Sequence, residues 1–189
     1  MRIGHLDLSR HIAGAEEQLV VLVEALSAHG IEQHVLVRNP FLAKRLSVCN
    51  RVSVGPVVRS SVTAALLMPD VDIVHVHDRR GATAGMLLNM VKSVSYVVTC
   101  REKRACGRAS SWHPKYSRAE FIACPSREIA CVLRQSFPSK IVDIIGDARN
   151  PGDIVDAENG RISAARMAAD YLHVYRRALD HRGVPAILI

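Results

Sequence analysis

Apolar residues in the first part of the chain fall into a short run followed by a helical stripe. The run Arg2–Asp7 is typical of a strand, and it is followed by a polar loop. The next apolar residues recur at helical spacing on one face, at Leu19, Leu22, Val23 and Leu26. Gly30 is suited to end this helix, because glycine readily adopts the left-handed conformation of a helix C-terminus. The pattern predicts the opening strand and helix of a parallel sheet.

The alternation of strand-like and helix-like segments continues through the first three quarters of the chain. Further strands are predicted at 33–37, 51–58, 71–77, 95–100, 121–124 and 141–145. Helices are predicted at 81–92 and 127–135. Strands joined through helices form parallel sheets with right-handed crossovers. The sequence therefore predicts an α/β fold, a Rossmann-like parallel sheet flanked by helices.

The C-terminal part has a different pattern. Residues 146–160 are rich in Gly, Asp, Asn and Pro, as expected of a linker or surface loop. A helical stripe follows at Ala165, Ala168, Ala169, Leu172, Tyr175 and Leu179. Ser163 is a suitable N-cap for this helix. We expect a Rossmann-like domain over residues 1–150, a linker over 151–160, and a closing helix and tail over 161–189 that pack on the same domain.

Composition and charge narrow the choice of partners. Hydrophobic residues make up 49% of the chain and aromatic residues 4%, so aliphatic side chains must form the core, as in strands buried on both faces. The net charge of +7 favours phosphate-bearing partners such as a phosphorylated glycan or an anionic membrane surface. No basic stripe interleaved with aromatic residues is present, which argues against nucleic acid. An ordinary solvated basic surface stays an alternative.

The cysteines and the apolar runs indicate a compartment. None of the five cysteines forms a pair with the two-residue spacing of a metal or redox motif, which favours a reducing environment. The apolar run at the N-terminus is too short for a signal peptide, and no segment approaches the ~20 apolar residues of a membrane span. We expect a cytoplasmic protein, with any membrane contact peripheral at the inner face of the cytoplasmic membrane.

Candidate chemistry lies just after the strands, because open α/β sheets bind ligands beyond the carboxyl ends of their strands. Three polar segments occupy such positions, at 9–16, 75–80 and 101–104, and all should meet at one edge. The first lacks the glycine spacing of a dinucleotide fingerprint, so no cofactor is predicted. Gly14 either allows close approach of an acceptor or phosphate, or only makes a tight turn.

The second segment contains two histidines on one strand face. His75 and His77 are two residues apart, and Asp78 follows them. They are candidates for an acid/base pair or a metal site, and the alternative is a structural role in the core. No metal is assigned, because two histidines and one carboxylate at neighbouring positions are a weak metal signal.

The third segment is basic. Arg101, Lys103 and Arg104 are placed to clamp a phosphate or carboxylate, or else form a solvated charged loop. Cys100 and Cys106 flank this loop, where a thiol pKa would be lowered. A cysteine nucleophile is not favoured, because no histidine and acid are ordered around them in a known pattern.

A set of short motifs occurs in a fixed order along the chain. They are Ile3-Gly-His-Leu-Asp, Gly14-Ala-Glu, Asp72-Ile-Val-His-Val-His-Asp, Val97-Val-Thr-Cys-Arg-Glu, Phe121-Ile-Ala-Cys-Pro-Ser-Arg and Lys140-Ile-Val-Asp-Ile-Ile-Gly. Together they resemble the N-terminal, acceptor-side domain of family 4 glycosyltransferases of the GT-B fold. In that family a C-terminal domain binds the nucleotide sugar. Its paired glutamates have no counterpart after Gly146, so the chain resembles a single half of a GT-B fold with a closing helix.

The resemblance implies roles for individual residues. Catalytic candidates are His77, Asp78 and Arg101, the last at a position that is often histidine in the family. Candidate acceptor contacts are Arg10, Gly14, Ala15, Glu16, His75, Arg79, Lys103 and Ser126. The resemblance implies that Gly14 to Glu16 border the predicted cleft and that His75 to Asp78 lie at its floor.

The expected function is that of a glycosyltransferase-type protein in surface polysaccharide or lipopolysaccharide assembly. This chain would contribute the half that binds a glycan or lipid-linked acceptor. A nucleotide sugar would bind only if a partner or a dimer supplied the donor site. One alternative is a non-catalytic binding or scaffold protein for a phosphorylated glycan, an anionic lipid or a protein partner. Another is a small enzyme whose cleft is built by a homodimer.

Overall fold

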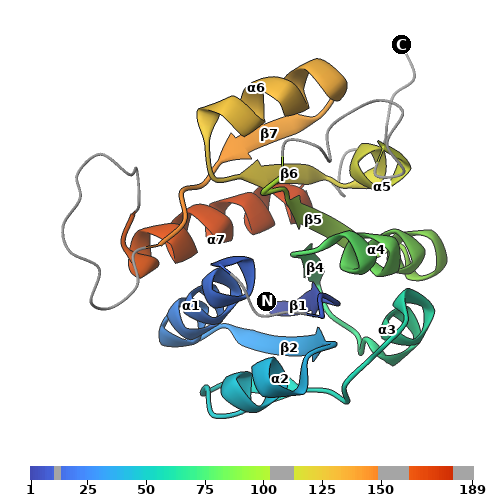
Figure 1. The fold of residues 1–189 in the computed structure, drawn as a ribbon, viewed down its shortest axis with the longest axis vertical. Coiled ribbons are helices and arrows are strands. Elements are labelled where there is room, and N and C mark those ends of the chain that lie inside the picture. The colour runs from blue at the N-terminus through green and yellow to red at the C-terminus, as the bar shows by residue number, and fades with distance from the viewer. Residues whose placement is uncertain (11–13, 103–112, 149–161, 181–189) are drawn as a thin grey trace.

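Seven parallel strands form one sheet in the order β3-β2-β1-β4-β5-β6-β7 (Figure 1). The computed structural model describes residues 1–10, 14–102, 113–148 and 162–180. The strands are β1 (Arg2–Asp7), β2 (Glu32–Val37), β3 (Val52–Val54), β4 (Ile73–Val76), β5 (Ser95–Thr99), β6 (Phe121–Cys124) and β7 (Ile141–Ile144). The predicted α/β fold with a Rossmann-like parallel sheet is confirmed.

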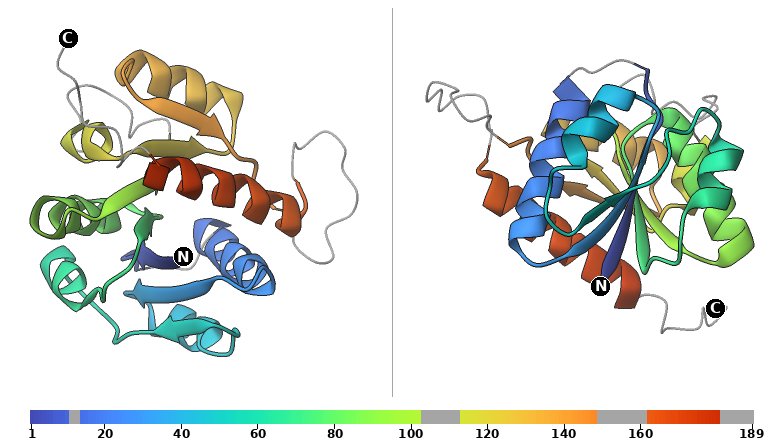
Figure 2. Two further views of the ribbon diagram at one scale, coloured as in Figure 1. Left: turned by 180° about the vertical axis from the view of Figure 1, so that it is seen from behind. Right: turned by 90° about the horizontal axis from the view of Figure 1, so that it is seen from below.

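Helices cover both faces of the sheet, as Figure 2 shows. The helices are α1 (Gly14–Ala28), α2 (Pro40–Leu46), α3 (Ser61–Leu67), α4 (Arg79–Lys92), α5 (His113–Arg118), α6 (Arg127–Ser136) and α7 (Ala164–Asp180). On one face, buried residues of α3, α4, α5 and α6 form a core with the sheet. On the other face, α1 packs with α2 and with α7. The C-terminal helix α7 therefore lies on the same sheet as the rest of the chain.

Most of the predicted elements lie within a few residues of their expected bounds. The strand expected at 51–58 is wrong in its second half, because only Val52–Val54 pair with β2. The helices α2, α3 and α5 were not predicted. Gly30 has a φ of 74° and ends α1 as expected. Residues 151–160 and the tail 181–189 lie outside the described residues.

The strand order reverses between β1 and β4. The chain runs outward from β1 through β2 to β3, then returns to place β4 on the other side of β1. Ligands of open α/β sheets bind beyond the carboxyl ends of the strands at such a switch point. In the parallel register His5 of β1 lies directly beside His75 of β4, which brings polar side chains to this point. Among the described helices, none is long and apolar enough to cross a membrane.

Candidate functional site

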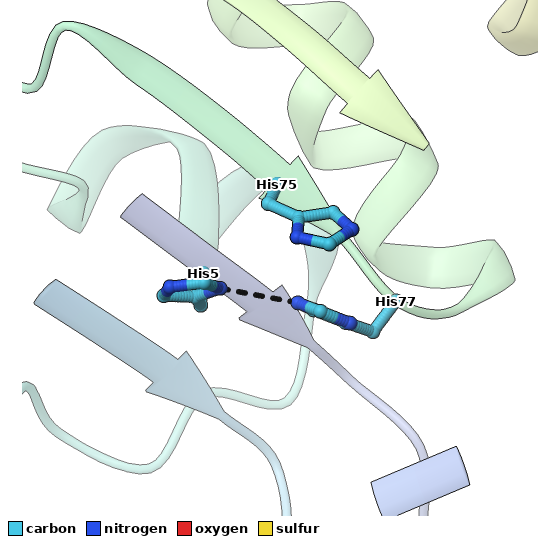
Figure 3. A group of neighbouring side chains, drawn as sticks. All are labelled: His5, His75 and His77. Carbon is cyan, nitrogen blue, oxygen red and sulfur yellow. Dashed lines mark hydrogen bonds between the residues drawn. The ribbon is translucent and has the colours of Figure 1, made fainter. Parts of the chain in front are cut away.

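Three buried histidines lie side by side at the switch point, between the sheet and the layer of α1 and α7. His5 comes from β1, His75 from β4, and His77 from the residue after Val76 at the end of β4. The ring centroids of His75 and His77 are 4.0 Å apart, and those of His5 and His77 are 5.4 Å apart. Figure 3 shows the three rings turned toward one another. The alternation of side chains along parallel strands places all three on one face.

A chain of hydrogen bonds connects two of these rings to β2. His77 Nε2 lies 3.1 Å from His5 Nδ1, and His5 Nε2 lies 3.1 Å from Gln33 Oε1. Gln33 Nε2 in turn donates to the carbonyl oxygen of Val23 and to Ser27 Oγ in α1. His77 Nδ1 is buried and has no hydrogen-bond partner among the described residues. The chain therefore ends in one unpaired ring nitrogen.

A second set of hydrogen bonds ties α7 to the sheet. His75 Nδ1 lies 2.7 Å from the Tyr175 hydroxyl, and His75 Nε2 lies 2.6 Å from Thr99 Oγ1. Thr99 Oγ1 also lies 2.8 Å from the Tyr171 hydroxyl. Both tyrosines belong to α7 and are buried. His75 is therefore held in the interior by α7 and β5.

Burial keeps all three imidazoles neutral at neutral pH. It lowers the pKa of His5 to about 4, against a weaker opposing effect of the hydrogen bond to Gln33. Burial also lowers the pKa values of His75 and His77 well below 6.5. His5 and Arg101 lower the pKa values of both further, and His75 adds to the effect on His77. A neutral imidazole offers one lone pair, so each ring can accept a hydrogen bond at one nitrogen and donate one from the other.

The same three rings are close enough to share a metal ion. One ring nitrogen from each residue lies within 4.8 Å of the others, and neutral imidazole is the form that binds metals. A metal held between His5 Nδ1 and His77 Nε2 would, however, break the hydrogen bond that joins them. Five of the six ring nitrogens have hydrogen-bond partners among the described residues. These hydrogen bonds account for the cluster without a metal.

A cleft of about 490 Å³ lies beyond the carboxyl ends of the central strands. It is lined by Ser9, Ala15, Glu16, His77, Asp78, Arg79, Thr99, Arg101, Glu102 and Tyr116. A larger hollow of about 630 Å³ lies at the amino ends of β1, β2 and β3, where this fold class does not bind its ligands. The smaller cleft is therefore the candidate site, because residues that follow β1 and β4, the strands on either side of the switch point, line it.

Arg101 brings a positive charge to this cleft. Its Nη2 lies 3.1 Å from Asp147 Oδ1, which fixes one side of the guanidinium. Its Nη1 is buried and has no partner among the described residues. The cleft is thus lined by two residues with unpaired buried atoms, a guanidinium nitrogen of Arg101 and a ring nitrogen of His77. An unpaired buried polar atom is costly, and such atoms gather where ligands bind.

Asp78 lines the cleft, but its carboxylate already accepts hydrogen bonds from backbone N–H groups. It is the N-cap of α4 and accepts hydrogen bonds from the backbone N–H groups of Arg80 and Gly81. It also accepts one from the N–H of Leu8, which follows β1. Burial raises the pKa of Asp78, and these backbone hydrogen bonds oppose that effect. The structure shows Asp78 joining β1 to α4, and its catalytic role stays a prediction.

The other predicted site residues fall into two groups. Ala15, Glu16 and Arg79 line the cleft, and Gly14 begins the same helix as the first two. Glu16 is buried there and accepts a hydrogen bond from Ser9 Oγ.

The remaining residues lie elsewhere. Arg10 is exposed, and its carbonyl accepts a hydrogen bond from Asn39. Ser126 caps α6, and His75 is buried behind the cleft without lining it. Lys103, Arg104 and Cys106 lie outside the described residues.

Several polar residues of this region were not predicted as site residues. They are His5, Gln33, Thr99, Tyr171 and Tyr175. All lie inside strands or a helix, whereas site residues were expected just after the strand ends. The order of the strands was the missing signal, because placing β4 beside β1 would have brought His5 next to His75.

Comparison with solved structures identifies a similar fold. The chain superposes on the Anabaena protein Alr3699/HepE in complex with UDP-glucose with a TM-score of 0.62 at 13% sequence identity. A structure of the same protein with UDP and glucose gives a TM-score of 0.60 at 12% identity. The match covers 79% of this chain and 44% of that protein, so the chain spans less than half of its length. At this identity the likeness shows the fold alone.

No protein-family model matches the sequence. No curated protein matches it either.

Proposed function

We propose that this chain is the acceptor-binding part of a glycosyltransferase-type protein, and that its ligand is a phosphorylated or phosphate-linked sugar. The observation that carries the proposal is the pair of unpaired buried atoms on the cleft residues His77 and Arg101. A sugar hydroxyl can donate to a ring nitrogen, and a phosphate oxygen can accept from a guanidinium. A ligand with both groups would satisfy both residues.

Each cleft residue has a distinct role in this proposal. Arg101 binds the oxyanion and keeps its orientation through Asp147. His77 accepts a hydrogen bond from a hydroxyl of the acceptor and so orients it. Asp78 holds α4 against the end of β1 and thereby shapes the wall beside His77. Orienting the reactive hydroxyl is a major part of what an enzyme contributes to group transfer.

The fold supports a sugar ligand. The similar protein HepE was solved with UDP-glucose and with UDP and glucose, and this chain matches 44% of its length. Because the chain resembles the acceptor-side half of family 4 enzymes, we propose that a partner or a second copy supplies the nucleotide-sugar site. The family 4 resemblance supports a place in surface polysaccharide or lipopolysaccharide assembly. The net charge of +7 is compatible with docking on an anionic membrane.

Calorimetric titration of the purified chain tests the proposal. We expect saturable binding of a sugar phosphate such as glucose 1-phosphate and no saturable binding of UDP-glucose alone. Arg101→Gln should weaken sugar phosphate binding by about 10- to 100-fold, since a hydrogen bond to a charged group contributes about 1.5–3 kcal/mol. Arg59→Gln, which changes an exposed arginine, is the matched control. Equal binding by both variants would refute the assignment of the cleft.

A non-catalytic binding protein is the second candidate, favoured by Asp78, whose carboxylate accepts hydrogen bonds from three backbone N–H groups. It would use the same cleft. Sugar transfer after addition of the proposed donor-side partner separates the two, because a binding protein would hold the sugar phosphate without transfer.

A further inference from the structure

We propose that Gln33 and His5 are positioning residues that hold His77, which lines the cleft, as a single tautomer with its lone pair on Nδ1. The consequence is a rule for the ligand, which must present a hydrogen-bond donor such as a hydroxyl to His77. The inference rests on the proposed function for the identity of the ligand, whereas the tautomer itself does not depend on that function.

The orientation of the Gln33 amide is the first step. One end of the amide lies 2.9 Å from the carbonyl oxygen of Val23 and 3.0 Å from Ser27 Oγ. A carbonyl oxygen only accepts hydrogen bonds, so the end facing Val23 must be the NH2 group. The amide oxygen of Gln33 therefore faces His5 Nε2, at 3.1 Å. The backbone of α1 thus decides which way the amide points.

The tautomers of both histidines follow from this orientation. An amide oxygen cannot donate, so His5 Nε2 must carry the proton. His5 is neutral because it is buried, so its Nδ1 has only a lone pair. His77 Nε2 lies 3.1 Å from that lone pair and must therefore donate to it. A neutral His77 then has no proton on Nδ1, the one ring nitrogen of the cluster without a partner among the described residues.

This arrangement discriminates between ligand groups. A hydroxyl placed at His77 Nδ1 can donate a hydrogen bond, whereas a phosphate oxygen would bring two lone pairs together. Arg101 shows the opposite preference, because a guanidinium only donates. The cleft therefore orients a sugar phosphate with its oxyanion toward Arg101 and a hydroxyl toward His77. Without the bonds from Gln33 and His5, His77 could take the other tautomer and the preference would be lost.

Long-range ¹H–¹⁵N correlation spectra of the ¹⁵N-labelled full chain at pH 7 test the tautomer directly. The His77 signals are assigned by their loss in His77→Gln. In the wild type we expect a protonated Nε2 and an unprotonated Nδ1 for His77. A proton on Nδ1, or a mixture of the two forms, would overturn the proposal without any further variant. Spectra that change when EDTA is added would show a bound metal and would overturn it as well.

Variants test whether His5 and Gln33 cause the effect. His5→Phe removes the acceptor for His77 Nε2–H, so the His77 signals should shift to a mixture of tautomers. Gln33→Leu should do the same by freeing His5. His5→Asn offers an amide oxygen at the place of Nδ1 and should restore the single tautomer. His34→Asn, on the same strand as Gln33 but outside the hydrogen-bond chain, is the matched control. An unchanged His77 tautomer in folded His5→Phe would refute the positioning role.

Ligand binding gives a readout that loss of packing alone would not produce. His5→Phe should weaken binding of glucose 1-phosphate about 5- to 10-fold, as expected for one hydrogen bond, and leave binding of inorganic phosphate unchanged. Equal loss for both ligands would contradict the proposed division between His77 and Arg101. If the wild type bound neither ligand, the proposed function would be refuted. The tautomer of His77 would still be tested independently by the NMR spectra.

Discussion

The buried carboxyl group of Asp7 makes the stability of the chain depend on pH in a direction opposite to that of the buried histidines. Asp7 ends β1 and is 1% exposed. Its Oδ1 accepts a hydrogen bond from the backbone of Ser9, and its Oδ2 has no partner among the described residues. Burial, followed by the nearby charges of Asp78 and Glu16, raises the pKa of Asp7 from 3.8 to about 7.

The sign and size of the effect follow from linkage. Between about pH 4 and pH 7 the folded chain holds a proton on Asp7 that the unfolded chain has lost. Stability from this group is therefore greatest in acid and falls as pH rises toward the folded-state pKa. Between pH 5 and pH 8 the loss is about 3 kcal/mol, since each pKa unit corresponds to about 1.4 kcal/mol. Asp7→Asn keeps the shape of the side chain and removes this dependence.

Urea denaturation of the wild type and Asp7→Asn at pH 5 and pH 8 measures the effect. The difference in unfolding free energy, variant minus wild type, should become more positive by about 3 kcal/mol from pH 5 to pH 8. The contributions of the buried histidines cancel in this difference because both proteins contain them. Asp70→Asn, which alters an exposed carboxylate, is the control substitution. Parallel pH profiles for wild type and Asp7→Asn would refute the reasoning.

Two further predictions concern packing around the site. A Cβ at Gly81 would lie 2.9 Å from the backbone oxygen of Leu6, so Gly81→Ala should destabilise the chain by about 1–3 kcal/mol in urea denaturation. Gly14→Ala is the matched control, because a Cβ there meets nothing within 4 Å, and equal stability of the two variants would contradict the argument. Tyr175→Phe leaves His75 Nδ1 without its hydroxyl partner and should cost about 1–3 kcal/mol by the same assay. An unchanged unfolding free energy would show that this bond contributes nothing.

The sheet could be predicted from the sequence because its strands are apolar runs separated by turns. β4, β5 and β6 are buried at every position, which produces a continuous apolar signal. The helices α2, α3 and α5 could not be found by periodicity, because each has only six or seven residues. Asn39 and Ser60 do cap α2 and α3, so the start signals were present. Two turns of helix are too short for an apolar stripe to stand out.

The candidate site could be predicted only for residues that follow a strand of the parallel sheet. His77 and Arg101 were expected at one edge because both follow strands of a parallel sheet, and they do line the same cleft. Ser126 also follows a strand, yet its side chain is used to cap α6. His5 and Gln33 lie within strands, and their importance depends on which strands are neighbours and on how the amide of Gln33 is turned. A sequence pattern contains neither fact.

The C-terminal helix explains how so polar a layer can lie inside the chain. Ala148 is fixed to α1 by two hydrogen bonds with the Gln18 side chain, and α7 then crosses the sheet. Its residues Tyr171 and Tyr175 bring hydroxyl groups to the buried polar groups of β4 and β5. Buried polar groups need such partners, because each unpaired one costs about 1–3 kcal/mol. On the residues that line the cleft, His77 Nδ1 and Arg101 Nη1 have no hydrogen-bond partner among the described residues. A ligand that pairs with both atoms would recover this cost, which is why the binding experiments change Arg101 and His5, the residue that positions His77.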